Sequence, residues 1–331
     1  MSKDTKGTSR REFIRRTAST ATGLAVGLSS MSSSVFAGTA GANERIRVGF
    51  IGLGNRGTQL MQRFMANSDV EVAALCDVYE PYTLRDRSKV DPRWLQIGKV
   101  PKMGEKFQNK PKRFNDFRDL LEDKSIDAVC ISTPDHWHAV QTIAALDAGK
   151  DVYVEKPLTI SLQEGRQMVN AEAGTDRIVA VGLNRRGSSV YQDLAGRVSD
   201  GVIGEVRTAR CYRISNMYPD GIGAMQPEDP PPGFDWDMWL GPRPYRPYQY
   251  NIAPYYFRWW KNYSSQMGNW GVHYMDVIRW MVGETAPVAV SAHGSKLLGD
   301  DKTIPDTMEV TFEFGNGMIA QFHIYEACGA E

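Results

Sequence analysis

The sequence lacks an excess of charge and any long apolar run, and each absence argues against a class of protein. Its 39 basic and 39 acidic residues balance over a length of 331. There is therefore no concentrated basic surface of the kind that nucleic-acid binding requires. No segment reaches the roughly 18 consecutive apolar residues that a transmembrane helix needs. We expect no nucleic-acid partner and no stable membrane span.

Cysteine is also scarce, and its placement predicts neither a metal centre nor a disulfide framework. The four cysteines are Cys76, Cys130, Cys211 and Cys328, and none has the spacing of a metal ligand. Cys76 and Cys130 fall inside apolar runs, where a thiol packs as a small buried group.

The first 37 residues have the layout of an export signal. A basic segment that reads SRREFIRR is followed by small, mildly apolar residues and by a cleavage-like Val-Phe-Ala that ends at residue 37. The paired Arg10 and Arg11 match the motif of the twin-arginine translocation (Tat) pathway. We expect residues 1–37 to be a Tat signal peptide, with the Tat machinery as a partner and the mature protein in the periplasm or elsewhere outside the cytoplasm.

Beyond the signal, apolar runs typical of strands alternate with helical patterns. The strand-like runs are 45–51, 70–77, 127–131 and 152–154. This alternation predicts a Rossmann domain over residues 38–157, with a doubly wound parallel sheet. The polar segment 88–113, rich in lysine and proline, interrupts the pattern, and we expect it to be a surface excursion.

A second pattern begins near residue 158. Ser161 and Glu164 have the spacing of a capping box at the start of a helix. Strand-like runs then follow at 177–182, 204–213, 286–293, 307–314 and 317–325. An Asn-Gly turn separates the last two, which is a hairpin signal. We predict an α+β domain over residues 158–331, with a mainly antiparallel open sheet that binds substrate and forms oligomers, so that the whole chain is of the α/β class.

A glycine-rich loop follows the first predicted strand. Gly52, Gly54 and Gly57 form a G-x-G-x-x-G pattern between a strand and a helix, and Asp77 ends the next strand. In such loops the glycines permit a tight turn, close approach to a pyrophosphate and packing of the helix on the strand. The helix N-terminus attracts the phosphates. Asp77 would accept hydrogen bonds from the ribose hydroxyls and repel a 2′-phosphate, which favours NAD over NADP.

Seven segments together resemble the Gfo/Idh/MocA family of oxidoreductases, which includes glucose–fructose oxidoreductase and inositol dehydrogenase. They read VGFIGLGNRG, CDVYEP, STPDHWHA, VYVEKPL, VGLNRR, GVIGEV and NWGVHYMDVIRW. The resemblance runs from about residue 45 to the end. It implies a sugar or polyol substrate, a nicotinamide cofactor and a homo-oligomer whose open sheets pair face to face.

The resemblance implies that Lys156, in the Glu-Lys-Pro segment, lies beside the nicotinamide and the substrate hydroxyl. Desolvation lowers the pKa of a lysine in such a place toward the working pH, where it can exchange a proton. His273 matches a second catalytic position and is a candidate acid or base. Asn269 stands where the family usually has aspartate; it cannot take a proton, but it can hydrogen-bond a substrate hydroxyl. Arg186 and Asp276 are further candidates for substrate binding.

The same resemblance assigns the loop at 132–138 to the cofactor. His136 and His138 could be metal ligands, but the sequence offers no third ligand beside them. We therefore predict no metal site. The candidate cofactor-binding residues are Gly52, Gly54, Asn55, Arg56, Gly57, Asp77, Thr133, Pro134, His138, Glu155 and Lys156. An aromatic-rich segment, 234–260, either stacks on sugars or covers an insertion and an oligomer interface.

These patterns leave three functions open. The first is an exported oxidoreductase that acts on a sugar or polyol hydroxyl and keeps its NAD tightly bound, since no soluble NAD pool exists outside the cytoplasm. The second is an NAD-dependent glycoside hydrolase that oxidises its sugar transiently. The third is a binding protein that retains its cofactor without catalysis. We also expect the chain to be truncated at its C-terminus, because family members usually continue further.

Overall fold

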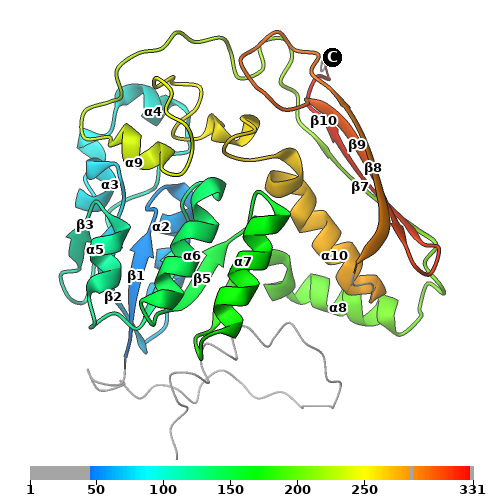
Figure 1. The fold of residues 1–331 in the computed structure, drawn as a ribbon, viewed down its shortest axis with the longest axis horizontal. Helices are drawn as coiled ribbons and strands as arrows, with labels where there is room; N and C mark the ends of the chain where they lie inside the picture. The colour runs from blue at the N-terminus through cyan, green and yellow to red at the C-terminus, as the bar shows by residue number, and fades with distance from the viewer. Residues whose placement is uncertain (1–44, 284–285, 329–331) are drawn as a thin grey trace, which may run out of the picture. The chain divides into compact units, whose positions relative to one another are not determined.

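The computed structural model describes residues 45–283 and 286–328, and the predicted signal peptide therefore lies outside the described residues. The described chain forms two compact units. The first comprises residues 45–133, 138–155 and 165–182; the second comprises the remaining described residues. Figure 1 traces the elements of both. None of the helices within these described residues has the length and apolar character of a membrane span.

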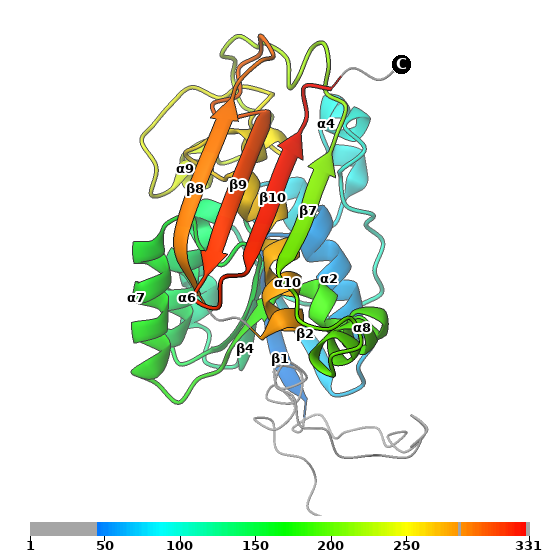
Figure 2. The same ribbon diagram turned by 90° about the vertical axis from the view of Figure 1, so that its right-hand side faces the viewer.

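The first unit is built on a six-stranded, entirely parallel sheet in the order β3-β2-β1-β4-β5-β6. Its strands are β1 (Ile46–Ile51), β2 (Val70–Cys76), β3 (Lys112–Phe114), β4 (Ala128–Ile131), β5 (Asp151–Glu155) and β6 (Val179–Gly182). Its helices are α2 (Asn55–Met65), α3 (Glu80–Leu84), α4 (Pro92–Gln96), α5 (Phe117–Glu122), α6 (His138–Asp147) and α7 (Leu162–Ala173). Figure 2 shows α2 on one side of the sheet and α6 and α7 on the other, which confirms the doubly wound architecture.

The burial of the strands explains why their sequences read as continuous apolar runs. Every residue of β2 is buried, as are all four residues of β4. A parallel sheet that is covered on both faces removes the alternation of apolar and polar residues that a half-exposed strand shows. The thiols of Cys76 and Cys130 lie within these strands, where both are free and buried.

Two expectations about the first unit need correction. The run 177–182 was expected in the second sheet, but β6 pairs in parallel with β5 and becomes the sixth strand of the first. The segment 88–113 is only partly a surface excursion. It contains α4, which begins at an Asp91 N-cap, and the Trp94 side chain is 1% exposed and packs 4.5 Å from the Tyr79 ring.

The second unit holds a four-stranded sheet in the order β7-β10-β9-β8, seen face-on in Figure 2. Its elements are α8 (Ser189–Ser199), β7 (Thr208–Ile214), α9 (Trp236–Leu240), α10 (Val272–Val282), β8 (Pro287–Ser295), β9 (Thr307–Phe314) and β10 (Ile319–Tyr325). Only β7 and β10 pair in parallel, so the sheet is mainly antiparallel, as predicted. Gly317, with φ +82°, turns the hairpin from β9 to β10. The capping box is also present, since Ser161 and Glu164 exchange hydrogen bonds of 3.2 Å at the start of α7.

One face of this second sheet is buried and the other is open. Buried side chains from β10, β9 and α10 form the core, among them Phe322, Ile324 and Met275. On β7 and β8, apolar side chains remain exposed, including Tyr212 at 61% and Val290 at 56%. Exposed apolar surface is typical of an interaction face. The predicted homo-oligomer stays a prediction, and this is the face where we expect it to form.

The aromatic-rich segment 234–260 forms a small core of its own within the second unit. The rings of Trp236 and Trp239 stack with centroids 4.8 Å apart, and Tyr248 meets Trp236 edge-on at 5.2 Å. Seven of its eleven aromatic side chains are buried: Phe234, Trp236, Trp239, Tyr248, Phe257, Trp259 and Trp260. Their faces are therefore covered by protein, which leaves little of this segment to stack on a sugar.

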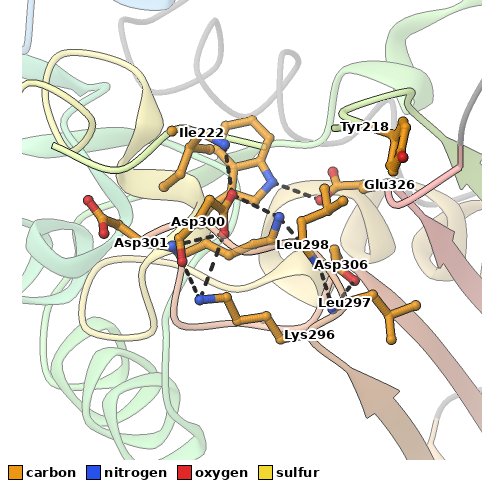
Figure 3. Close-up of polar contacts among 12 residues, drawn as sticks. Tyr218, Ile222, Lys296, Leu297, Leu298, Asp300, Asp301, Asp306 and Glu326 are labelled. Atoms are coloured by element: carbon orange, nitrogen blue, oxygen red, sulfur yellow. Dashed lines mark hydrogen bonds and ion pairs between the residues drawn. The ribbon is translucent and has the colours of Figure 1, made fainter. Parts of the chain in front are cut away.

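A cluster of charged side chains lies in the loop between β8 and β9. Lys302 is 1% exposed, and its ammonium group lies 2.9 Å from an oxygen of Asp300 and 3.3 Å from one of Asp306. Asp306 also accepts hydrogen bonds from the backbone N–H groups of Leu297 and Leu298. Figure 3 shows these labelled carboxylates converging on the loop, with Glu326 at its edge. The cluster satisfies its own charges and fixes the loop.

Removal of the central cation should destabilise the second unit. Lys302→Met would remove the counter-charge of the buried Asp306 and leave Asp300 with the more distant Lys296, at 3.8 Å, and we expect the free energy of unfolding to fall by about 3–5 kcal/mol. Chemical denaturation measures this. Lys296→Met is the matched control, since its side chain is 40% exposed and an exposed ion pair contributes less than about 1 kcal/mol. Equal losses in the two variants would contradict the assignment.

Candidate active site

The glycine-rich loop joins β1 to α2 in a conformation that only glycine allows. Gly52 has φ +86°, and a Cβ atom on it would lie 2.7 Å from the backbone nitrogen of Thr133. A Cβ on Gly57 would lie 1.9 Å from the carbonyl oxygen of Gly52. Both glycines are therefore required by the packing of the loop against its own backbone and against the end of β4.

Gly54 has a different environment, which fits a dinucleotide. A Cβ on Gly54 would meet no protein atom within 4 Å, so space is open beside this residue. Gly54 is also the N-cap of α2, and no side chain caps the helix there. No side-chain cap therefore competes for the backbone N–H groups of the first turn, which includes Asn55 and Arg56. This combination suits a pyrophosphate, which needs close backbone approach and free N–H donors.

Asp77 lies at the end of β2 and contacts the same loop. Its carboxylate accepts hydrogen bonds from the backbone N–H of Leu53 at 2.6 Å and of Tyr79 at 2.9 Å. Burial raises the pKa of Asp77 to about 6, against an ordinary value of 3.8, although these hydrogen bonds and Arg85 oppose the shift. The residue as a whole is partly exposed.

An ion pair links the glycine-rich loop to the end of β5. The Arg56 guanidinium donates from Nε to Glu155 Oε1 at 2.8 Å, and its Nη2 lies 2.7 Å from the same oxygen. Glu155 is 5% exposed and lies against Gly182 of β6, where a Cβ would approach its Oε1 to 2.9 Å. The sequence marks both residues as cofactor candidates, but it does not reveal that they bind each other.

The 132–138 loop divides between the two units. In the first, the His138 ring is 1% exposed and its Nε2 lies 2.9 Å from the Thr133 carbonyl oxygen, while Thr133 Oγ1 donates to Gln141 at 2.8 Å. The His138 ring thus shapes the loop from within. Contact of Thr133, Pro134 and His138 with a cofactor stays a prediction.

Residues 134–137 of this loop belong to the second unit and make structural contacts there. His136 Nε2 lies 2.9 Å from the Trp239 carbonyl oxygen, and Ser264 donates a short hydrogen bond to Asp135. Among residues 45–283 and 286–328, no group of three or more metal-ligating side chains comes together.

Lys156 is held by contacts within the second unit. Its ammonium group donates to the backbone carbonyl oxygen of Asn269 at 2.9 Å. Next to it, Pro157 packs on Gly268, where a Cβ would come within 3.0 Å of the proline ring. Asn269 is 8% exposed and lies in a π-helical turn, η6 (Met267–Gly271), directly before α10. The structure therefore brings two of the predicted catalytic-site residues together, but through a backbone atom.

The remaining candidates lie on or beside α10. His273 is the second residue of this helix and is partly buried. Asp276 accepts from Arg186 Nε and Nη2 at 2.8–3.0 Å, and the Arg186 guanidinium lies 5.2 Å from the Trp280 ring centre. This bidentate pair ties the 184–187 turn to α10. Binding of substrate by either residue stays a prediction.

The two groups can perform complementary tasks. The first unit offers open space at a helix N-terminus and a carboxylate at the next strand end, a combination that holds a dinucleotide. The second unit offers Lys156, which the Asn269 carbonyl oxygen fixes. His273 follows Asn269 by four residues in the sequence. The chain itself joins the two groups, because Glu155 and Lys156 are consecutive.

Comparison with known proteins gives a consistent result. Residues 46–183 match a family model described as "Oxidoreductase family, NAD-binding Rossmann fold". Residues 205–323 match the same family's C-terminal alpha/beta domain. The crystal structure of GenD2 from gentamicin A biosynthesis, in complex with NAD, superposes on this chain with a TM-score of 0.65 at 20% sequence identity. The superposition covers 92% of this chain and 70% of the GenD2 chain. At that identity the likeness shows a shared fold.

Two curated relatives match about half of the chain. A glycosyl hydrolase family 109 protein of Solibacter usitatus is 32% identical over 172 residues, which cover 51% of this chain and 37% of the relative. An inositol 2-dehydrogenase of Salmonella typhimurium is 30% identical over 163 residues, which cover 48% and 43%. The alignments thus span less than half the length of these relatives.

The titration of Asp77 should appear in the pH dependence of NAD binding. Because the pKa is about 6, the carboxylate is ionised above that pH and protonated below it, where it loses an acceptor for the ribose hydroxyls. For protein from which bound NAD has been removed, we expect the Kd for NAD to rise about tenfold between about pH 7.5 and pH 5, by calorimetric titration. Asp77→Asn should flatten this dependence, while the exposed Asp147→Asn should preserve it. A pH dependence that survives Asp77→Asn would refute the assignment.

Proposed function

Because this chain belongs to the Gfo/Idh/MocA oxidoreductase family, we propose that it is an NAD-dependent oxidoreductase that acts on a hydroxyl of a sugar or polyol. The observation that carries the proposal is the fixed position of Lys156, whose ammonium group lies 2.9 Å from the Asn269 carbonyl oxygen. The Salmonella relative is named as an inositol 2-dehydrogenase, and this name supports a polyol substrate.

The residues of the chain divide the reaction between binding and proton transfer. The glycine-rich loop and Asp77 would hold the dinucleotide, which would supply the hydride acceptor for the carbon that bears the hydroxyl. Lys156, as the neutral amine, takes the proton from that hydroxyl, and the Asn269 carbonyl keeps its nitrogen in place. Precise placement of a proton acceptor contributes a large part of such catalysis. His273 is the second candidate proton carrier.

We further propose that the enzyme is exported with NAD already bound and retains it through each cycle. The twin-arginine segment supports this, since the Tat pathway carries folded proteins with their cofactors. An enzyme that released NADH outside the cytoplasm would meet no soluble pool from which to replace it. A cycle closed within the site, by two half-reactions on different sugars, satisfies this constraint.

A second function also has a specific observation in its favour. The Solibacter relative is named as a glycosyl hydrolase, and oxidation followed by re-reduction of one sugar would close the cycle as well. Asn269 in place of the family's aspartate is compatible with this chemistry, because a side chain that cannot titrate leaves proton transfer to Lys156 and His273.

One set of assays separates the two functions. The purified protein should show nicotinamide absorbance without added NAD. Free sugars and inositols, offered as a panel, should reduce the bound NAD, and Lys156→Met should lower kcat by about 10²–10⁴-fold with NAD still bound. Lys261→Met, an exposed lysine, is the control. Release of phenol from aryl glycosides without net NADH would instead establish the hydrolase, and full activity of Lys156→Met would overturn the site.

Export can be tested separately from catalysis. Replacement of Arg10 and Arg11 by lysine should keep the protein in the cytoplasmic fraction, because the Tat pathway requires the paired arginines. The same replacement at Arg15 and Arg16 preserves charge and should leave export unchanged. Cell fractionation with immunodetection measures both, and export of the first variant would refute Tat transport.

A further inference from the structure

The turn that presents its carbonyl to Lys156 is held by several side chains from elsewhere in the second unit. At one end, Ser264 is 1% exposed and donates to Asp135. At the other, Asn269 N–H donates to the Ser265 carbonyl at 2.8 Å, and Gly268 packs on Pro157. Residues 264–269 form what we call the lysine-facing turn.

The middle of the lysine-facing turn is held by a buried carboxylate. Gln266 is 2% exposed, and its side-chain amide donates to Glu326 Oε2 at 2.7 Å. The same oxygen accepts from Trp259 Nε1 at 2.8 Å. Glu326 is fully buried, and burial raises its pKa. No described residue makes a hydrogen bond to its other oxygen, Oε1.

Glu326 is itself fixed by its own backbone. Its N–H donates to the Asp306 carbonyl at 2.8 Å, and its carbonyl accepts from Met217 N–H at 2.9 Å. Asp306 belongs to the buried cluster around Lys302. Figure 3 shows Glu326 beside that cluster, at the end of β10. The carboxylate therefore stands on a rigid support and has little freedom to follow a moving turn.

We propose that Glu326 is a positioning residue, which through Gln266 holds the lysine-facing turn so that the Asn269 carbonyl meets the Lys156 ammonium group. The inference rests on the proposed function, because it assigns to Glu326 an effect on the proton transfer at Lys156. A buried carboxylate is costly to desolvate, and its retention beside apolar and aromatic side chains needs a reason beyond packing. The hydrogen bond to Gln266 supplies that reason.

Three variants test the inference. Gln266→Met keeps the length of the side chain and removes the donor to Glu326. Trp259→Phe removes the other donor to the same oxygen without altering the turn, so it is the matched control. Glu326→Gln is the conservative rescue, since one amide oxygen can still accept from both donors while the amide nitrogen takes the place of the unbonded oxygen.

The first readout is independent of activity. Hydrogen exchange of the peptide that spans the turn, in the full-length protein, should accelerate at least tenfold in Gln266→Met and stay within threefold of wild type in the other two variants. Unchanged exchange in Gln266→Met, or equal acceleration in Trp259→Phe, would overturn the role of Glu326 as an anchor.

The second readout is kinetic and uses whichever sugar or inositol of the panel reduces the bound NAD. We expect kcat of Gln266→Met to fall about tenfold or more, with KM and NAD content within threefold of wild type, and near-normal kcat in Trp259→Phe and Glu326→Gln. A fall that appears only in KM, or equally in Trp259→Phe, would overturn the inference. If the wild type reduces NAD with no probe, the proposed function fails and the catalytic role of Glu326 fails with it, whereas hydrogen exchange still decides the anchor.

Discussion

The hydrogen bond from Lys156 to the Asn269 carbonyl is the constraint on which the second unit's part of the site depends. A lysine side chain has a flexible four-carbon stem and a strongly hydrated ammonium group. It therefore keeps one position only when a rigid hydrogen-bond acceptor fixes the ammonium group. The acceptor here is a backbone atom, and its rigidity comes from the surrounding contacts at Asp135, Pro157 and Glu326. Placement of the proton carrier is thus a property of a whole turn.

This constraint changes the meaning of Asn269. In the sequence, asparagine in place of aspartate suggests that the proton relay lacks one of its groups, because the asparagine side chain cannot titrate. In the structure, the contact with Lys156 uses the carbonyl oxygen, which every residue type provides. The anchoring of the lysine is therefore insensitive to the substitution. What the substitution removes is a second titrating group beside Lys156, and in the proposed mechanism proton transfer is therefore assigned to Lys156 and His273.

Features that depend on local chemistry could be predicted from the sequence, and those that depend on distant packing could not. A few consecutive residues are enough to specify three of the predicted features: the glycine-rich loop, the capping box at Ser161 and the Asn-Gly hairpin. The assignment of β6 failed because a short apolar strand does not specify which sheet it joins. The burial of Trp94 was missed because the surrounding segment is polar on average. The pairs Arg56–Glu155 and Gln266–Glu326 join residues about 100 and 60 positions apart.

The two units use different physical means to fix their candidate site residues. In the first unit, the glycines at positions 52 and 57 let backbone pack on backbone. The space beside Gly54 is open, because no protein atom lies within 4 Å of the position that its Cβ would take. In the second unit, the chain is held by hydrogen bonds between buried polar side chains, such as the bond from Gln266 to Glu326. Under the proposed function, retention of the cofactor depends on the first arrangement, and proton transfer depends on the second. A substitution in the lysine-facing turn should therefore affect the chemical step before it affects retention of the cofactor.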